Sequence, residues 1–141
     1  MKILLDTNLA LRAYDSKDPS HIRIHAFLQS LSREDEVFVC PQVVFELRVV
    51  LTRPSADNGF GLTGSQFDKT VSDLLKDFSF LPDPHDLLYR WMRLCDENAI
   101  LGKQSHDARL VAWMEAYGVD SILTLNTRHF AVFESIQVLT P

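Results

Sequence analysis

Five short, mostly apolar runs recur along the chain, and they limit the folds that it can adopt more than any other feature. The runs cover residues 3–5, 37–40, 78–81, 122–125 and 136–139. Each has the length of a buried strand, and longer stretches with a helical spacing of apolar residues separate them. Strands that alternate with helices in this way form βαβ units, in which the strands are parallel. The sequence therefore predicts an α/β fold around a parallel sheet.

Turn and capping residues indicate where some of the intervening helices begin. Pro41 suits the first position of a helix, because its missing N–H needs no partner there. Thr63 and Gln66 have the spacing of a capping box. Glu46 and Arg48 are the only polar residues between positions 43 and 51. Two helical residues turn through about 200°, so at least one of these side chains should face the protein or a cleft.

We interpret residues 1–141 as one domain, since no internal repeat or linker divides them and a chain of this length buries roughly two-thirds of its unfolded surface. No segment has the apolar length of a membrane span or the pattern of a signal peptide, so we expect a soluble cytoplasmic protein. The net charge of −5 argues against a broad basic surface that coats nucleic acid. Cys40 and Cys95 predict core thiols rather than a disulfide framework or a zinc site.

Asp6 follows the first apolar run directly, in the segment Leu5-Asp6-Thr7-Asn8. The carboxyl end of a strand is where open α/β sheets bind ligands, so a carboxylate there has a positional reason to take part in chemistry. The same residue, or Asn8, also suits the N-cap of a helix that we expect to begin near Leu9, because Asp and Asn lead the N-cap preferences. Taken alone, its position favours the cap.

Two further polar residues occupy notable positions downstream. Asp107 lies early in a predicted helix for which Ser105 is a reasonable cap, and an acid there gains about 0.3–1 kcal/mol from the helix dipole. Asn126 follows the fourth apolar run and lies beside Asp6 if the first and fourth strands are neighbours. Each has an ordinary explanation as well, Asp107 in helix stability and Asn126 as a turn residue.

In combination, these positions resemble the PIN-domain ribonucleases, and the chain is similar to the VapC-like toxins of bacterial toxin-antitoxin pairs. The resemblance rests on four segments in order, residues 3–8, 41–46, 102–109 and 122–130. It implies a three-layer α/β/α fold with a central five-stranded parallel sheet, and it implies that Asp6, Glu46 and Asp107 meet at the carboxyl edge of that sheet. Many PIN domains carry a fourth acid near the end of the fourth strand, where this chain has Asn126 and then His129. That departure puts a second metal site, or its affinity, in doubt.

The activity implied by the resemblance is metal-dependent hydrolysis of single-stranded RNA. Carboxylate oxygens select hard cations such as Mg²⁺ or Mn²⁺, and three crowded acids would repel one another without a cation. Asp6 and Asp107 are expected to bind the metal, and Glu46 to bind it through water or to assist the nucleophile. The residues expected to orient ligands or phosphate are Thr7, Asn8 and Asn126, and the cations expected to contact RNA are Arg48, Lys103, Arg109 and Arg128. The toxin resemblance further implies a small antitoxin as partner and a homodimer, with no membrane partner.

Two other functions stay open from the sequence. A phosphatase of the haloacid-dehalogenase type would use Asp6 as its nucleophile, but that chemistry usually needs a second Asp two residues on, where this chain has Asn8. A PIN-fold module that binds RNA or protein without cutting is the more serious alternative, because Asn126 and His129 stand where acid is expected. A non-catalytic module need not bind Mg²⁺ or Mn²⁺ at Asp6 and Asp107, so metal affinity separates it from an enzyme.

Overall fold

The computed structural model describes residues 1–141 and contains one five-stranded sheet. Its strands are β1 (Lys2–Leu5), β2 (Glu36–Val39), β3 (Ser79–Phe80), β4 (Ser121–Leu123) and β5 (Gln137–Leu139). All neighbouring pairs are parallel, and the order across the sheet is β3-β2-β1-β4-β5. Each of the five apolar runs forms a strand, so the predicted parallel sheet is confirmed.

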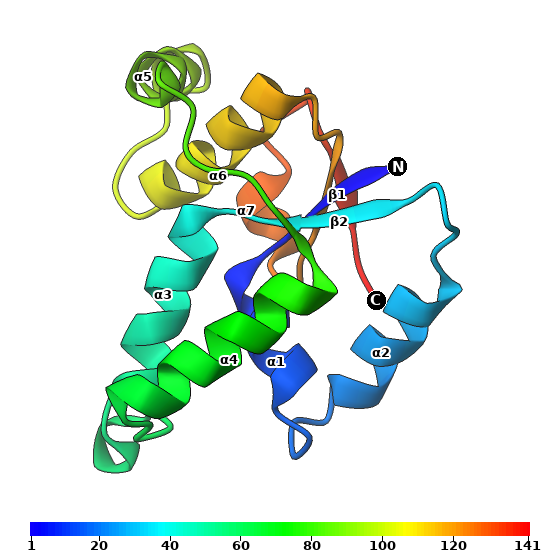
Figure 1. The fold of residues 1–141 in the computed structure, drawn as a ribbon. Coiled ribbons are helices and arrows are strands. Elements are labelled where there is room, and N and C mark those ends of the chain that lie inside the picture. Colours follow the sequence, from blue (N-terminus) through cyan, green and yellow to red (C-terminus); the bar gives the residue numbers. More distant parts are fainter.

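Seven α-helices cover the sheet. They are α1 (Thr7–Tyr14), α2 (His21–Ser30), α3 (Pro41–Thr52), α4 (Gly64–Asp77), α5 (Leu87–Glu97), α6 (Gln104–Tyr117) and α7 (Thr127–Phe130), with a short 3-10 helix, η1 (Ser55–Asp57), after α3. The chain first runs across the sheet from β1 through β2 to β3, and it then returns to the other side of β1 to form β4 and β5. Because parallel strands are joined by right-handed crossovers, this change of direction places α1 to α4 on one face of the sheet and α5 to α7 on the other. Figure 1 shows α1, α2 and α4 below the sheet and α5 and α6 above it. The expected three-layer α/β/α arrangement is confirmed.

The direction of the strand order reverses between β1 and β4, which are neighbours although more than a hundred residues separate them. Leu5 pairs with Leu123, and the backbone N–H of Asp6 donates to the Leu123 carbonyl at 3.1 Å. Helices pack on both faces of β1, which explains why Ile3, Leu4 and Leu5 are all fully buried and why the run is apolar without alternation. In open α/β sheets the crevice at such a reversal is the usual ligand site.

Two helices begin earlier than the sequence suggested. Helix α1 starts at Thr7 with Asp6 as N-cap, rather than near Leu9. Helix α6 starts at Gln104, because Lys103 already has helical dihedrals of φ −62° and ψ −27°. Ser105 therefore lies inside the first turn of α6 and is not its cap, which corrects that expectation. Pro41 at the start of α3 and the capping box at the start of α4 are as predicted.

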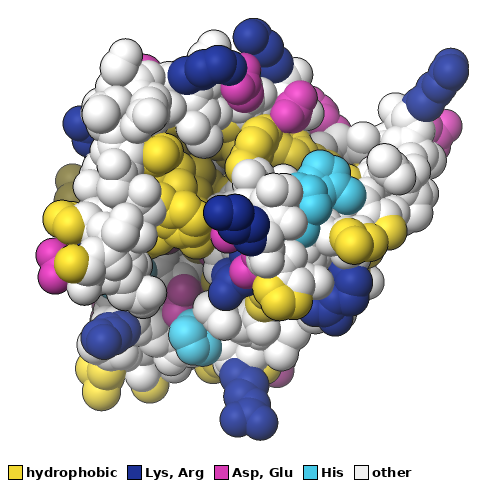
Figure 2. Space-filling view, turned by 90° about the horizontal axis from the view of Figure 1, so that it is seen from below, with side chains coloured by type: hydrophobic (Ala, Val, Ile, Leu, Met, Phe, Trp, Pro, Cys, Tyr) yellow, Lys and Arg dark blue, Asp and Glu magenta, His cyan; other side chains and the backbone are white.

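The expectations from composition concern membrane spans, the two cysteines and the distribution of positive charge. No helix combines the length and the hydrophobicity that crossing a membrane requires. Cys40 is buried and Cys95 is half-buried at the edge of the core, and neither forms a disulfide. On the face shown in Figure 2, the Lys and Arg side chains are dispersed as separate groups rather than gathered into one wide basic patch.

Candidate active site

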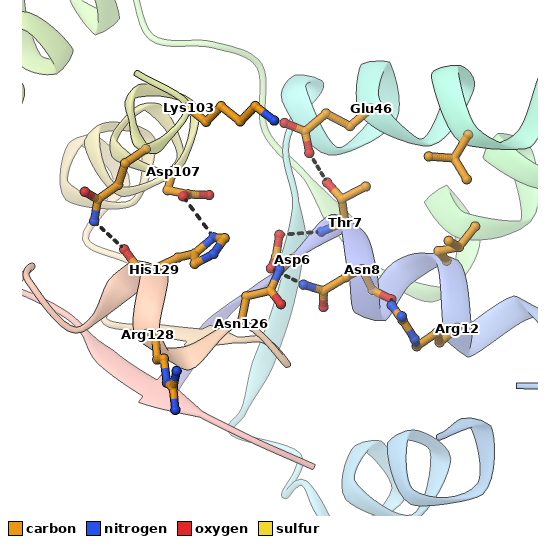
Figure 3. Close-up of a pocket in the computed structure, with 13 residues that line it drawn as sticks. Asp6, Thr7, Asn8, Arg12, Glu46, Lys103, Asp107, Asn126, Arg128 and His129 are labelled. Carbon is orange, nitrogen blue, oxygen red and sulfur yellow. Dashed lines mark hydrogen bonds and ion pairs between the residues drawn. The ribbon is translucent and has the colours of Figure 1, made fainter. Parts of the chain in front are cut away.

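A pocket of about 720 Å³ opens at the carboxyl ends of β1 and β4. Asp6, Glu46 and Asp107 all line it, although they come from the end of β1, from α3 and from α6. Figure 3 shows their carboxylates around one space, with Asp6 at its centre. The structure thus brings together the three acids that the sequence singled out.

Asp6 is both a helix cap and a wall of the pocket. Its side chain is only 7% exposed, and its two oxygens accept three hydrogen bonds. Oδ1 accepts the Thr7 backbone N–H at 2.7 Å, while Oδ2 accepts the Thr124 hydroxyl at 2.6 Å and the Asn8 amide at 2.8 Å. Burial raises the pKa of Asp6 above its ordinary value, these three donors oppose the shift, and the negative charge of Glu46 adds to it.

Glu46 is fixed through both of its oxygens. Oε2 accepts the Thr7 hydroxyl at 2.6 Å, and Oε1 accepts the side-chain amide of Gln42 at 2.8 Å. Gln42 lies one turn earlier on α3, so the contact is an i,i+4 pair. Thr7 therefore connects the two acids, because its backbone holds Asp6 and its side chain holds Glu46 (Figure 3).

Asp107, in the first turn of α6, faces His129 from α7. Asp107 Oδ2 and His129 Nδ1 lie 3.3 Å apart, and the His129 carbonyl accepts the amide of Gln104 at 3.0 Å. Burial is the largest cause of the raised pKa of Asp107, His129 opposes the shift, and the charges of Asp6 and Glu46 increase it. The three carboxylates thus repel one another across the pocket.

The end of β4 supplies a polar residue that the sequence reasoning missed. Thr124 is fully buried; its hydroxyl donates to Asp6 and accepts the backbone N–H of Asn126 at 2.9 Å. A hydroxyl at the end of an otherwise apolar run was the available signal. Asn126 lines the pocket with an exposed side chain, while Asn8 accepts the Leu125 N–H at 3.3 Å and so connects α1 to β4.

The four cations expected to contact RNA divide into two groups. Lys103 and Arg128 line the pocket, and Figure 3 shows the Lys103 amino group pointing across it towards Glu46. Arg48 and Arg109 do not line it. The Arg48 guanidinium lies over the Phe67 ring, 5.1 Å from the ring centroid, and Arg109 lines a neighbouring pocket beside α5.

Arg12 also lines the acidic pocket, although no sequence pattern singled it out. It donates to the Asn8 carbonyl at 2.9 Å and pairs with Asp18 at 3.2 Å. Arg12 lies in the C-terminal half of α1, one turn beyond Asn8. A helical projection of the residues after Asp6 would therefore have placed Arg12 on the same face as Asn8.

The donor set fits a hard divalent cation. The three acids supply only oxygen, and their mutual repulsion in a partly buried pocket is relieved by positive charge. No three His, Cys, Asp or Glu side chains are gathered tightly enough to hold an ion by themselves. Mg²⁺ is commonly bound by one or two carboxylates and several waters, so a looser arrangement of acids is compatible with it.

Comparison with known proteins gives a consistent family. The family model described as PIN domain matches residues 3–134. VapBC2 from Rickettsia felis, solved bound to a DNA fragment from its promoter, superposes with a TM-score of 0.76 at 15% identity, over 100% of this chain and 99% of that chain. VapBC-1 from nontypeable Haemophilus influenzae superposes with a TM-score of 0.72 at 14% identity, over 99% and 98% of the two chains.

VapC20 from Mycobacterium tuberculosis, described as a Sarcin-Ricin loop cleaving toxin, is also similar, with a TM-score of 0.68 and 16% identity over 93% of this chain and 95% of that chain. No curated protein matches the sequence. At these identities the solved structures establish a shared fold.

Proposed function

The chain belongs to the PIN domain family, and from that premise we propose that it is a divalent-metal-dependent endoribonuclease that hydrolyses single-stranded RNA. One observation carries the proposal. Asp6, Glu46 and Asp107, from three distant parts of the sequence, line one pocket at the point where the strand order reverses. A structural role explains one acid at a helix start, but it does not explain three that repel one another.

The residues around the pocket suit the hydrolysis of a phosphodiester. In the proposal Asp6 and Asp107 hold Mg²⁺ or Mn²⁺, and Glu46 binds it through water or assists the nucleophile. When bound, the ion supplies the positive charge that orients an attacking water and offsets charge on the phosphate. Thr7 holds Glu46 in place and Asn8 holds Asp6. Asn126 is exposed at the pocket, where it can contact phosphate.

The cations at the pocket support a nucleic-acid substrate. Lys103 and Arg128 lie on the α6 and α7 side, and Arg12 lies on the α1 side, so positive charge flanks the acids. A phosphate backbone that crosses the pocket therefore meets cations before and after the acidic centre. This arrangement gives local attraction without the broad basic surface that the net charge of −5 argues against.

The biological setting that we propose is that of a toxin controlled by an antitoxin protein. The similar structures include VapBC complexes, and one similar protein is described as a toxin that cleaves the Sarcin-Ricin loop. We propose a cognate antitoxin and a homodimer in the cytoplasm for this chain on that basis. Helix α5 leaves Leu88, Tyr89 and Met92 exposed, and such apolar side chains suit a protein interface.

A module that binds RNA or protein without cutting is the second candidate. The observation in its favour is that the acids do not form a preassembled group of three ligands, and that His129 and Asn126 stand near the position of a fourth acid. Such a module would tolerate loss of Asp6 or Asp107 without a change in its binding.

Cleavage of a mixed RNA pool separates the two candidates. Wild-type and Asp6→Asn proteins are each incubated with EDTA, Mg²⁺ or Mn²⁺, and circular dichroism verifies that both are folded. The enzyme proposal predicts cleavage by the wild type only with metal, and none by the variant. Equal cleavage by both proteins would remove Asp6 from the mechanism, and binding of RNA without cleavage in any condition would favour the module.

A further inference from the structure

Gln42 is a buried amide behind the acidic pocket, and it makes three side-chain hydrogen bonds. It is only 6% exposed and does not line the pocket itself. Its Nε2 donates to Glu46 Oε1 at 2.8 Å and to the His106 carbonyl at 2.9 Å, and its Oε1 accepts from Arg109 Nη1 at 3.1 Å. Both N–H groups and one acceptor position of the amide are therefore used.

The partners of Gln42 determine which way its amide faces. Arg109 can only donate, and the His106 carbonyl can only accept. A flipped amide would place its oxygen against that carbonyl and its NH₂ group against the guanidinium, which is unfavourable at both positions. Gln42 therefore presents an N–H to Glu46 Oε1, and this contact, together with the Thr7 hydroxyl on Oε2, determines how the carboxylate lies in the pocket.

Arg109 is held in turn by Asp83, which precedes α5. Arg109 Nη2 and Asp83 Oδ2 lie 2.6 Å apart, and the other Asp83 oxygen is buried without a partner. The guanidinium thus uses one nitrogen for Asp83 and another for Gln42, a forked geometry that Lys cannot reproduce. Three side chains, Asp83, Arg109 and Gln42, form a continuous chain that ends on Glu46.

We propose that Gln42 and Arg109 are positioning residues that fix the orientation of Glu46, the acid at the α3 wall of the active site. The inference rests on the proposed function, because it assigns a role within that site. It also replaces the expected role of Arg109: this cation acts through Gln42 and Glu46 rather than by contact with RNA.

A purely structural role is the competing explanation, since the same contacts join α3 to α6. The two explanations differ in what they predict for a folded variant. A structural cross-link changes the melting temperature and leaves the properties of the folded pocket intact. A positioning role changes metal affinity and kcat in protein that is fully folded.

The decisive variant is Gln42→Met, which keeps the length of the side chain and its neutral charge but removes the donor to Glu46. Mn²⁺ affinity is measured from the electron paramagnetic resonance signal of free Mn²⁺, and kcat and KM are measured on a fixed RNA substrate. We expect Mn²⁺ affinity and kcat each to fall by about 10- to 100-fold, as for other residues that orient metal ligands. We expect KM for RNA to change by less than about twofold, because Gln42 does not reach the pocket.

If Gln42→Met does not fold, Arg109→Lys tests the same inference. It keeps the positive charge beside Asp83 but cannot donate to Asp83 and Gln42 in the forked geometry of a guanidinium. Its matched control is Arg93→Lys, which alters the ion pair between Arg93 of α5 and Glu115 of α6, at 3.2 Å, and should leave both quantities unchanged.

Folded Gln42→Met or Arg109→Lys protein with wild-type Mn²⁺ affinity and kcat would overturn the inference and leave the proposed function standing. Wild-type protein that neither binds Mn²⁺ nor cleaves RNA would instead contradict the proposed function, and the positioning role would fall with it.

Discussion

Replacing Thr124 by Val should destabilise the protein in a way that depends on pH. The Thr124 hydroxyl is fully buried and donates to Asp6 Oδ2 at 2.6 Å. Valine has nearly the same shape, so the substitution removes the donor without leaving a cavity. It tests the claim that Asp6 is a buried carboxylate maintained by its hydrogen bonds.

The magnitude follows from the charge on the acceptor. A hydrogen bond to a charged group contributes about 1.5–3 kcal/mol, compared with about 1 kcal/mol for a neutral pair. The N–H of Asn126 loses the same acceptor, so the substitution removes two hydrogen bonds. We therefore expect the free energy of unfolding at pH 7.5 to fall by about 2 kcal/mol, which lowers Tm by about 4–8 °C for a domain of this size.

The sign of the pH dependence follows from the pKa of Asp6, which burial raises above its ordinary value while Thr124 opposes the shift. Because the folded protein holds this proton more tightly than the unfolded chain, stability falls as pH rises between the unfolded and the folded pKa. Loss of the Thr124 hydroxyl raises the pKa of Asp6 in the folded protein further, so the pH range over which stability falls extends to higher pH. The difference between the two proteins should therefore be smallest near pH 4 and should grow towards neutral pH.

Urea denaturation of both proteins from pH 4 to pH 8 measures this difference. Thr70→Val is the matched control, because the Thr70 hydroxyl donates at 3.1 Å to the backbone carbonyl of Gln66, a neutral acceptor. Its effect should be small and independent of pH. The reasoning is refuted if Thr124→Val is as stable as the wild type at pH 7.5, or if its loss of stability is the same at every pH.

Three further outcomes are expected. His129→Asp adds a carboxylate beside the acidic pocket and should lower the Mg²⁺ concentration needed for half-maximal binding, as calorimetry would measure; unchanged or weaker binding would contradict this. Gly59→Ala should destabilise the protein by about 1–3 kcal/mol in urea denaturation, because a Cβ there would clash with the Arg53 carbonyl oxygen. Unchanged stability would show that the loop rearranges freely. Burial raises the pKa of Cys40 to about 12, so a thiol reagent at pH 8 should modify Cys95 first and reach Cys40 only after unfolding; rapid modification of two thiols in native protein would argue against the packing.

Much of the fold was predictable because the strands are local features of the sequence. A run such as residues 3–5 is apolar because helices cover both faces of the sheet, so burial leaves a continuous signal. The starts of α1 and α6 were less predictable. Lys103 adopts helical dihedrals after Gly102, which turns the chain with a φ of +61°, and no N-cap side chain marks that position.

The site was predictable where a residue stands out from its local surroundings, as an acid does at a strand end, near a helix start or within an apolar stretch of helix. Asp6, Glu46 and Asp107 have that property, and they line one pocket. The signal at Thr124 and Gln42 is weaker, because their importance comes from contacts 118 and 64 residues away in sequence, to Asp6 and to the His106 carbonyl.

The cations show the same limit of local reasoning. Arg48 and Arg109 lie near the acids in sequence, as Lys103 does, yet only Lys103 among them lines the pocket. A helix turns by about 100° per residue, so two residues of separation from Glu46 or Asp107 direct a side chain to another face. Proximity in sequence therefore predicted which cations lie near the acids, but not which of their side chains point into the pocket.

The most direct test of the central claim is to locate where Mn²⁺ binds. In ¹⁵N-labelled protein, sub-stoichiometric Mn²⁺ should broaden the backbone amide signals of Thr7, Asn8 and Asp107 first, and EDTA should restore them. Asp6→Asn should abolish this selective broadening. Broadening centred on other residues, or no selective broadening even with Mn²⁺ in excess over the protein, would contradict the account that the three carboxylates form a metal site.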